Sequence, residues 1–291
     1  MKLGASSSWH LALGQSKLRA YDLTRRHALP AQCQMPTANV RPTERFSQRV
    51  ENYVKYRPGY PPELLDCLRE HCGLAPEWIV ADIGCGTGLL AELFLKNGNR
   101  VFGIEPNGEM RTAGETFLKK YEAFTSIAAP AESTTLASNS VDLIVAGQAF
   151  HWFDRARARR EFERILKSGG WVALIWNERL TNTPFLAAYE DMLHRYAPEY
   201  ENVDHRHIND EVIAEFFGSA AFQKFVLPNH QDFDYTGLVG RLLSSSFVPL
   251  KGQPGHDQLL ARNEQIFRDY ASGGRVRFEY ESKVYCGRFT L

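Results

Sequence analysis

The chain lacks an excess of charge of either sign. Its 291 residues include 34 basic and 34 acidic side chains, so the formal net charge at pH 7 is zero. A balanced chain has no overall electric field that would draw it to nucleic acid or to an anionic membrane surface. We therefore expect neither kind of partner, and a small molecule is the partner that the motifs below favour.

Long apolar runs are also absent. Charged or polar residues interrupt every apolar run well before the roughly 18 residues that a membrane-spanning helix needs. Hydrophobic residues still make up 44% of the chain, which is ordinary for a globular protein. The length suits one large domain or two modest ones with an ample core, and no membrane span is expected.

Cysteine is scarce, and its spacing forms no pairs. The five cysteines are odd in number and include no C-x-x-C pair, whereas disulfide frameworks and zinc sites need paired cysteines. We expect a reduced chain in the cytoplasm and no metal. His205 and His207 have no carboxylate or cysteine at ligand spacing, so we expect a surface loop there.

The first 34 residues differ in composition from the rest. They hold one acidic residue, Asp22, against a set of basic ones: Lys2, Lys17, Arg19, Arg25 and Arg26. Such a segment resembles an organelle transit peptide, but it lacks an amphipathic arginine face. The favoured interpretation is a disordered tail, or an upstream extension of a chain that begins at Met35. Residues 1–42 are expected to form an N-terminal extension without stable structure.

Strand-like and helix-like segments alternate from about residue 60. Between the expected strands, Asn107 and Asp154 are expected to cap helices, and Ser168-Gly169-Gly170 is expected to end the second of these. Strands that alternate with helices indicate a parallel sheet with helices on both faces. The apolar runs place the strands at 78–83, 101–105, 124–128, 141–146 and 171–176.

This alternation of strands and helices ends after Asn177. A helical stripe of apolar residues is expected over 185–196, followed by strand-like segments at 222–233 and 276–289. In the last segment apolar and charged residues alternate, as they do in a half-exposed strand. Shorter helices are expected at 212–217, 238–243 and 259–270.

A glycine-rich turn follows the first expected strand. Gly84, Gly86 and Gly88 alternate with other residues. Asp82 precedes the first glycine by two positions, and Glu105 ends the next expected strand. Glycines spaced this closely let the backbone turn sharply and approach a ligand, because no Cβ is in the way. A strand, such a turn and then a helix begin a nucleotide-type pocket.

The spacing of the glycines bears on which nucleotide fits. A dinucleotide-binding dehydrogenase uses the pattern G-x-G-x-x-G. Counted from Gly84, the sixth position is Leu89 rather than glycine. An NAD-dependent dehydrogenase therefore stays an alternative, weakened by Leu89.

The run Asp82–Gly88, D-x-G-x-G-x-G, resembles the first motif of the class I methyltransferases that use S-adenosylmethionine. The resemblance implies that cofactor, with Glu105 holding its ribose, since a carboxylate accepts two neighbouring O–H groups. It also implies an α/β fold with a seven-stranded, mostly parallel sheet, helices on both faces, an antiparallel last strand and a helical cap over the acceptor site. Residues 43–178 would form the cofactor-binding core, and residues 179–291 the cap helices and the last two strands of the same domain.

Two further segments resemble a subgroup that includes trans-aconitate and ubiquinone-pathway methyltransferases and carries a methyltransferase type 11 domain. One is Gln148–Phe153, at the end of the fourth expected strand, where open α/β sheets bind ligands. The other is Tyr53–Pro61, in which Arg57 suits the carboxylate of the cofactor. An exposed linker rich in proline and tyrosine is the alternative for the second segment.

The resemblance also assigns single residues. Glu132 would lie near the adenine amino group, with an exposed loop glutamate as an equal alternative. Asn177 and Glu178, at the end of the fifth expected strand, are candidates for contact with the acceptor. The implied cofactor-binding residues are Tyr56, Arg57, Asp82, Gly84, Cys85, Gly86, Thr87, Gly88, Glu105, Pro106, Met110, Ala131, Glu132, Gln148, Ala149 and Trp152.

His151 is the candidate catalytic residue. Methyl transfer to a hydroxyl or a carbon acid needs a general base, whereas a carboxylate or an amine accepts a methyl group without one. A histidine suits a base because its ordinary pKa lies near neutrality. An aromatic wall against the cofactor is the alternative role for His151.

The sequence thus predicts an enzyme, a methyltransferase that uses S-adenosylmethionine and a small-molecule acceptor. A catalytically silent module that binds the cofactor and acts as a partner or sensor is the alternative. The basic run from Arg155 to Arg160 does not change this interpretation. Glu161 and Glu163 follow Arg157 and Arg159 by four residues, which indicates a solvated helix face rather than a nucleic-acid patch.

Overall fold

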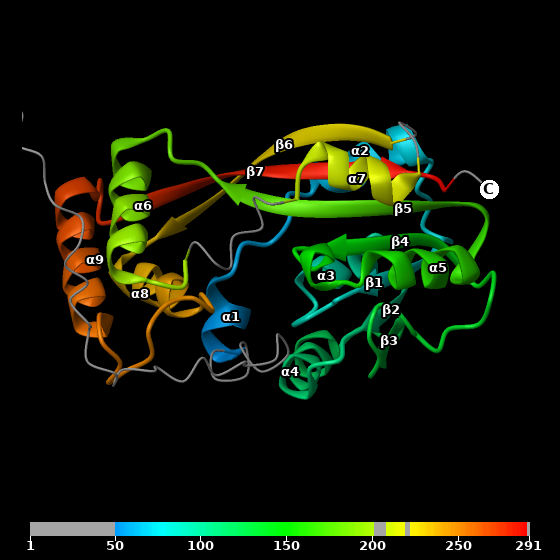
Figure 1. The fold of residues 1–291 in the computed structure, drawn as a ribbon, viewed down its shortest axis with the longest axis horizontal. Helices are drawn as coiled ribbons and strands as arrows, with labels where there is room; N and C mark the ends of the chain where they lie inside the picture. Colours follow the sequence, from blue (N-terminus) through cyan, green and yellow to red (C-terminus); the bar gives the residue numbers. More distant parts are fainter. Residues whose placement is uncertain (1–49, 201–207, 219–221, 290–291) are drawn as a thin grey trace, which may run out of the picture. The chain divides into compact units, whose positions relative to one another are not determined.

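A seven-stranded sheet organises the computed structural model, which describes residues 50–200, 208–218 and 222–289. The strands lie in the order β3-β2-β1-β4-β5-β7-β6 (Figure 1). Their bounds are β1 (Ile79–Ile83), β2 (Arg100–Ile104), β3 (Phe124–Ile127), β4 (Val141–Gly147), β5 (Leu166–Arg179), β6 (Phe222–Phe233) and β7 (Val276–Gly287).

Helices connect most of these strands, and a short 3-10 helix, Phe150–Trp152, follows β4. The α-helices are α1 (Val50–Tyr56), α2 (Glu63–Cys72), α3 (Leu89–Lys96), α4 (Gly108–Leu118), α5 (Arg155–Ile165), α6 (Pro184–Tyr196), α7 (Asp210–Phe217), α8 (Tyr235–Leu243) and α9 (His256–Tyr270).

The direction of the strands confirms the expected fold class. Strands β3, β2, β1, β4 and β5 pair in parallel, whereas β7 is antiparallel to both of its neighbours, β5 and β6. A parallel pair needs a long crossover, which the helices α3, α4 and α5 supply. The chain moves outward from β1 through β2 to β3, and then in the opposite direction through β4 to β5. The strand order therefore reverses between β1 and β4.

Side chains on β4 show how both faces of the sheet are covered. Leu143 and Val145 pack with α2 and α3, while Ile144 and Ala146 pack with α5 and α7 on the other face. All four side chains have no solvent exposure. A parallel strand covered by helices on both faces has this continuous apolar sequence.

A third apolar cluster joins α6, α8 and α9 to the far ends of β6 and β7. Tyr189, Leu238, Leu259 and Phe278 are among its buried members. β7 runs past the end of β5, because Arg179, the last residue of β5, pairs with Tyr280 of β7. Figure 1 shows α6, α8 and α9 gathered around this projecting end, with α1 next to α8. These helices form the expected cap.

The expected membership of the cap was wrong for α7. Phe216 of α7 lies 4.6 Å from Phe150 and 6.0 Å from Phe162, measured between ring centroids. Phe217 of the same helix has no solvent exposure. Helix α7 therefore packs on α5 and covers the main sheet, because Phe216 meets Phe162 of α5 and Phe150 of the 3-10 helix.

The expected end of the charged helix also needs correction. Asp154 and Asn107 do cap their helices, accepting from the amides of Arg157 at 3.1 Å and Met110 at 2.9 Å. Helix α5 ends at Ile165, however, before the expected stop at Ser168-Gly169-Gly170. The next residue, Leu166, already pairs with Val141 in the sheet, and the β4–β5 register shifts just after this pair.

Several expectations fall outside the described residues. These are the N-terminal extension over 1–42, the start of the core at residue 43, and the loop with His205 and His207. Among the helices that the structure describes, none combines the length and apolar character that a bilayer crossing needs. The same residues bring no three metal-ligating side chains together.

Candidate active site

The turn after β1 is built against the neighbouring strands. Gly84 and Gly88 have φ of 72° and 85°, a region that side chains disfavour. A Cβ on Gly84 would lie 2.4 Å from the Cβ of Ala149, and a Cβ on Gly88 would lie 2.5 Å from Leu118. The amide of Gly84 donates to the carbonyl of Ile104 in β2 at 2.9 Å. Both conformation and space therefore require glycine at these two positions.

Glu105 lies directly behind this turn. Its Oε2 accepts a hydrogen bond from the amide of Gly86 at 2.9 Å, and its Oε1 accepts from the amide of Asn107 at 2.8 Å. The residue is 9% exposed, and burial raises the pKa of the carboxyl although both amides act to lower it. The carboxylate is thus held at the turn and does not point into bulk solvent.

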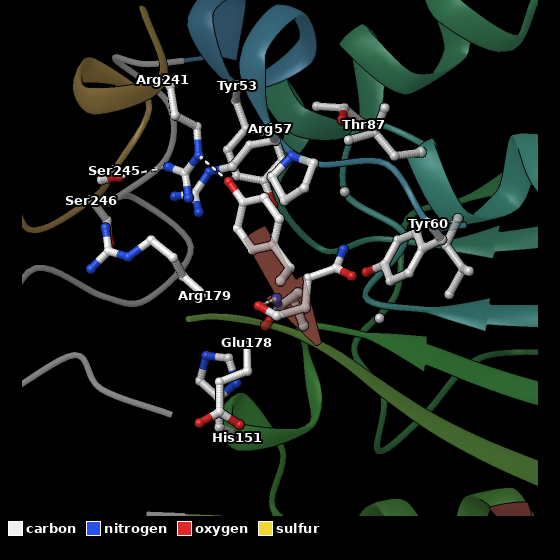
Figure 2. A pocket seen from close by; sticks show the side chains of 18 of the residues that line it. Tyr53, Arg57, Tyr60, Thr87, His151, Glu178, Arg179, Arg241, Ser245 and Ser246 are labelled. Carbon is white, nitrogen blue, oxygen red and sulfur yellow. Dashed lines mark hydrogen bonds between the residues drawn. The ribbon is translucent and has the colours of Figure 1, made fainter. Parts of the chain in front are cut away.

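A cavity of about 340 Å³ opens in front of the turn. It lies at the carboxyl ends of β1 and β4, where the strand order reverses and where open α/β sheets bind ligands. Figure 2 shows side chains from distant parts of the chain around it, with Thr87 and Tyr60 on one side and Arg241, Ser245 and Ser246 on the other.

Asp82, the last polar residue of β1, lines this cavity. It is 1% exposed, and neither carboxylate oxygen has a hydrogen-bond partner among the described residues. Burial raises the pKa of Asp82 to about 7, against a smaller lowering by the nearby Cys85 thiol. The hydroxyl of Thr87 is also buried and without a partner. Buried polar groups in this state are suited to a ligand that satisfies them.

Half of the implied cofactor residues line the cavity, and His151 lines it with them. The lining members are Arg57, Asp82, Gly84, Cys85, Gly86, Thr87, Gln148 and Trp152. The other implied residues lie outside the cavity wall: Tyr56, Gly88, Glu105, Pro106, Met110, Ala131, Glu132 and Ala149.

The residues outside the wall have contacts that explain their places. Tyr56 packs on Gly240 of α8, where a Cβ would lie 2.0 Å from its ring. Glu132 accepts a hydrogen bond from the amide of Asp154 at 2.8 Å. Ala149 supports the turn beneath Gly84, as described above, and Ala131 belongs to the core on the α5 side of the sheet.

The segment after β4 brings His151 to the cavity. Gln148 has φ of 56°, which is uncommon for a residue other than glycine, and its side-chain Nε2 donates to the backbone carbonyl of Asn177 at 2.8 Å. His151 and Trp152 follow in the 3-10 helix, with ring centroids 4.8 Å apart. Glu178 lines the same cavity and forms an ion pair with Lys283 of β7 (Figure 2).

Three arginines from separate elements meet at the cap side of the cavity. Arg57 follows α1, Arg179 ends β5 and Arg241 belongs to α8 (Figure 2). Arg179 forms an ion pair with Glu190 of α6 and also donates to the hydroxyl of Tyr200 at 3.0 Å. The pairing places Arg179 and Glu190 together as a neutral unit in the wall.

Arg241 and Arg57 are held by neutral groups instead. Arg241 is 7% exposed and donates from Nε to the hydroxyl of Tyr280 at 3.3 Å and from Nη1 to Ser245 at 3.2 Å. Arg57 donates from Nη2 to the carbonyl of Ser244 at 3.1 Å. Burial, followed by the charge of Arg241, lowers the pKa of Arg57 to about 10.

The sequence interpretation did not identify Arg179 or Arg241. The sequence does mark Arg241, because it shares one face of α8 with Leu238 and Leu242. A charged residue on an apolar helix face is unusual. Arg179 directly follows Asn177 and Glu178, so it belongs to the same strand end that was expected to reach the acceptor.

Comparison with known proteins relates part of the sequence to methyltransferases. Residues 81–174 match the family model described as a methyltransferase domain. Uncharacterized methyltransferase Rv3342 of Mycobacterium tuberculosis is 37% identical over 134 residues, which are 46% of this chain and 52% of that protein. Uncharacterized methyltransferase C25B8.09 of Schizosaccharomyces pombe is 28% identical over 52% of this chain and 59% of its own length. The match thus spans little more than half the length of these relatives.

Solved structures share the fold at low sequence identity. One, from Anaeromyxobacter dehalogenans and assigned as a Type II methyltransferase, has a TM-score of 0.59 at 22% identity and covers 80% of this chain and 98% of its own. Another, from Anabaena variabilis, has a TM-score of 0.56 at 17% identity and covers 82% of this chain. Residues 81–174 are therefore similar to a methyltransferase domain, and the chain shares the Rossmann-like fold of methyltransferase structures.

Proposed function

We propose that this chain is an enzyme that transfers a methyl group from S-adenosylmethionine to a small-molecule acceptor. The observation that carries the proposal is the buried carboxylate of Asp82, which has no partner among the described residues and lines the cavity in front of the glycine turn. Such a group needs a donor or a cation from a ligand. The methionine part of this cofactor carries an ammonium group.

Other residues around the cavity fit the same ligand. Arg57 has no carboxylate partner among the described residues and suits the carboxylate of the cofactor. Thr87 offers a hydroxyl that has no partner in the described chain. Glu105 is fixed at the turn beside the amide of Gly86, where each oxygen keeps a lone pair for a ribose hydroxyl. These groups would bind opposite ends of one molecule.

The cofactor-binding residues implied by the sequence enter the proposal in three sets. The residues of the cavity wall and Glu105 would contact the ligand, and Gly88, Met110 and Ala149 would shape the turn behind them. Tyr56, Pro106, Ala131 and Glu132 stay predictions, and binding of S-adenosylhomocysteine measured on variants at these positions would decide their roles.

The chain's own residues would orient the reaction. When bound, the cofactor supplies a methyl group that its sulfonium has already activated. The glycine turn and Arg57 would fix the position of that group, which removes much of the entropic part of the barrier. Tyr60, Trp152 and the cap would exclude water from the acceptor side. His151 would accept the proton of a hydroxyl acceptor through a ring nitrogen.

Two further predictions belong to this proposal. The subgroup with trans-aconitate and ubiquinone-pathway methyltransferases is supported by the resemblance of Gln148–Phe153 and Tyr53–Pro61, which lie together at the cavity. A cytoplasmic location is supported by the odd number of cysteines without a C-x-x-C pair. Cell fractionation with an antibody to the chain tests the location.

Isothermal titration with S-adenosylhomocysteine tests the proposal directly. We expect one site per chain with a dissociation constant in the micromolar range, on the order of −8 kcal/mol. A folded sample that gives no heat would end the proposal. Labelled methyl transfer to a metabolite extract, read by mass spectrometry, then separates an enzyme from a silent binding module.

A further inference from the structure

One buried and one half-buried guanidinium group line the cap side of the cavity, and neither has an ion-pair partner among the described residues. Arg241 and Arg57 form no salt bridge with any described residue. Their hydrogen bonds go to two hydroxyls and one backbone carbonyl, as given above. Nη2 of Arg241 and Nε of Arg57 have no acceptor in the described chain, and Nε of Arg57 is fully shielded from solvent.

Such an arrangement is unfavourable unless an anion completes it. A buried charge needs a counter-charge or a set of charge-assisted hydrogen bonds, because desolvation penalises it strongly. Here two cations lie close enough for Arg241 to lower the pKa of Arg57. That pKa, about 10, still leaves Arg57 protonated at neutral pH. The anions must come from ligands, since Glu190 is already paired with Arg179.

In the proposed function, the cofactor supplies an anionic partner for one of the two arginines. In the proposed function, the cofactor's carboxylate binds Arg57, which belongs to the same segment as Tyr60 and the wall beside the glycine turn. Arg241 comes from the cap, with Ser245 and Ser246 next to it in Figure 2. A second anionic group is therefore needed on the acceptor side.

We infer that the methyl acceptor is an anion whose carboxylate or phosphate group binds Arg241 of the cap. This inference rests on the proposed function and adds the class of acceptor to it. The hydroxyl of Tyr280 and the hydroxyl of Ser245 fix the orientation of the guanidinium, so little side-chain freedom is lost when the anion binds. A planar guanidinium binds a carboxylate or a phosphate through two parallel hydrogen bonds.

The tyrosines around Arg241 support its charged state. Burial acts to lower the pKa of Arg241, but Tyr280, Tyr189 and Tyr53 act in the opposite direction and the pKa is raised overall. Tyr280 also donates to Gln231 at 3.1 Å, so its own position is fixed from the strand β6 side.

The test uses the protein saturated with S-adenosylhomocysteine, so that Arg57 is already occupied. Anions and their neutral counterparts are then titrated calorimetrically: benzoate against benzamide, succinate against succinamide, and phenyl phosphate against phenol. We expect at least one anion to bind about 30-fold or more tightly than its neutral counterpart, as expected for a buried charge pair. Benzoate and phenyl phosphate distinguish a carboxylate from a phosphate acceptor.

Variants identify the arginine that binds the anion. Arg241→Gln should weaken the preferred anion by about 30-fold or more, and Arg241→Lys should restore part of the loss because it keeps the charge. Both variants should bind S-adenosylhomocysteine within about two-fold of the wild type. Arg160→Gln, an exposed change on α5, is the matched control and should alter neither affinity. Circular dichroism confirms that each variant is folded.

The outcomes separate this inference from the function on which it rests. If the wild type fails to bind S-adenosylhomocysteine, the proposed function fails first. If it binds that nucleoside but no anion binds more tightly than its neutral counterpart, the inference alone is overturned. Loss of nucleoside binding in a folded Arg241→Lys variant would also overturn it, because Arg241 would then serve the cofactor.

Discussion

The amide of Gly86 and the carboxylate of Glu105 are joined by a hydrogen bond of 2.9 Å. This bond ties the turn after β1 to the end of β2, so the acid that the sequence singled out holds the turn in shape. The same carboxylate keeps a lone pair on each oxygen for a ligand. Under the proposed function, Glu105 would thus connect the stability of the turn with binding of S-adenosylmethionine.

Replacing Glu105 with glutamine should affect both properties. The glutamine amide has one oxygen and one NH₂ group, so one of the two backbone amides loses its acceptor. We expect the free energy of unfolding to fall by about 1–3 kcal/mol, and the affinity for S-adenosylhomocysteine to fall about ten-fold or more. Urea denaturation and calorimetry measure the two effects. Unchanged affinity would remove Glu105 from the nucleotide site.

Gly84→Ala tests whether the turn requires glycine for space as well as conformation. The alanine Cβ would lie 2.4 Å from the Cβ of Ala149, and its backbone would keep a φ of 72° that alanine disfavours. We expect the free energy of unfolding to fall by about 2–5 kcal/mol, with loss of S-adenosylhomocysteine binding. Gly169→Ala is the control, because Gly169 has φ of 76° with no atom within 4 Å of a Cβ. Gly169→Ala should lower the free energy of unfolding by only about 1–2 kcal/mol. Equal losses would show that space at Gly84 is irrelevant.

The features that depend on residues close together in the chain could be predicted from the sequence. The glycine turn, the acid at the end of β2 and the caps at Asn107 and Asp154 depend on residues a few positions apart, and each is found where the sequence placed it. Alternating strands and helices also specified the sheet, because each strand must bury its apolar side chains against a neighbouring helix.

The rest depends on contacts between distant parts of the chain. Arg57 and Ser244 are joined across 187 positions, so no local pattern could place Arg241 beside Arg57 in one cavity. The apolar pattern of α7 is the same whether the helix belongs to the cap or covers the sheet, and the contacts of Phe216 with Phe150 and Phe162 decide between the two. Long-range packing therefore positions the residues on the cap side of the cavity.

His151 should reveal its role through the pH dependence of the reaction. With an acceptor found by the labelled-methyl screen, a general base at His151 predicts that His151→Phe lowers kcat by about 100-fold or more. The variant should also lose the rise in kcat with pH that deprotonation of a general base produces. A loss of only a few-fold with an unchanged pH profile would instead assign His151 to the wall of the cavity.

Phe217→Ala tests the corrected position of α7. The side chain has no solvent exposure and packs on the main sheet, so its loss should lower the free energy of unfolding by about 3–5 kcal/mol. Because α7 does not line the cavity, affinity for S-adenosylhomocysteine should stay within about two-fold of the wild type. A lower affinity for S-adenosylhomocysteine in a folded Phe217→Ala variant would show that α7 contributes to the cavity, as a helix of the cap would.

Asp82 should make the ligand-free protein less stable as pH rises. Its pKa is about 7 in the folded chain, against an ordinary value of 3.8 for an aspartate. The folded state therefore binds more protons than the unfolded state between these values, and stability falls from about pH 4 to pH 7 and then levels off. The three-unit difference corresponds to about 4 kcal/mol. Asp82→Asn should remove this part of the decline, which urea denaturation across the pH range measures, and should weaken nucleotide binding. If wild type and variant declined equally, the carboxylate of Asp82 would not be the buried charge that the nucleotide neutralises.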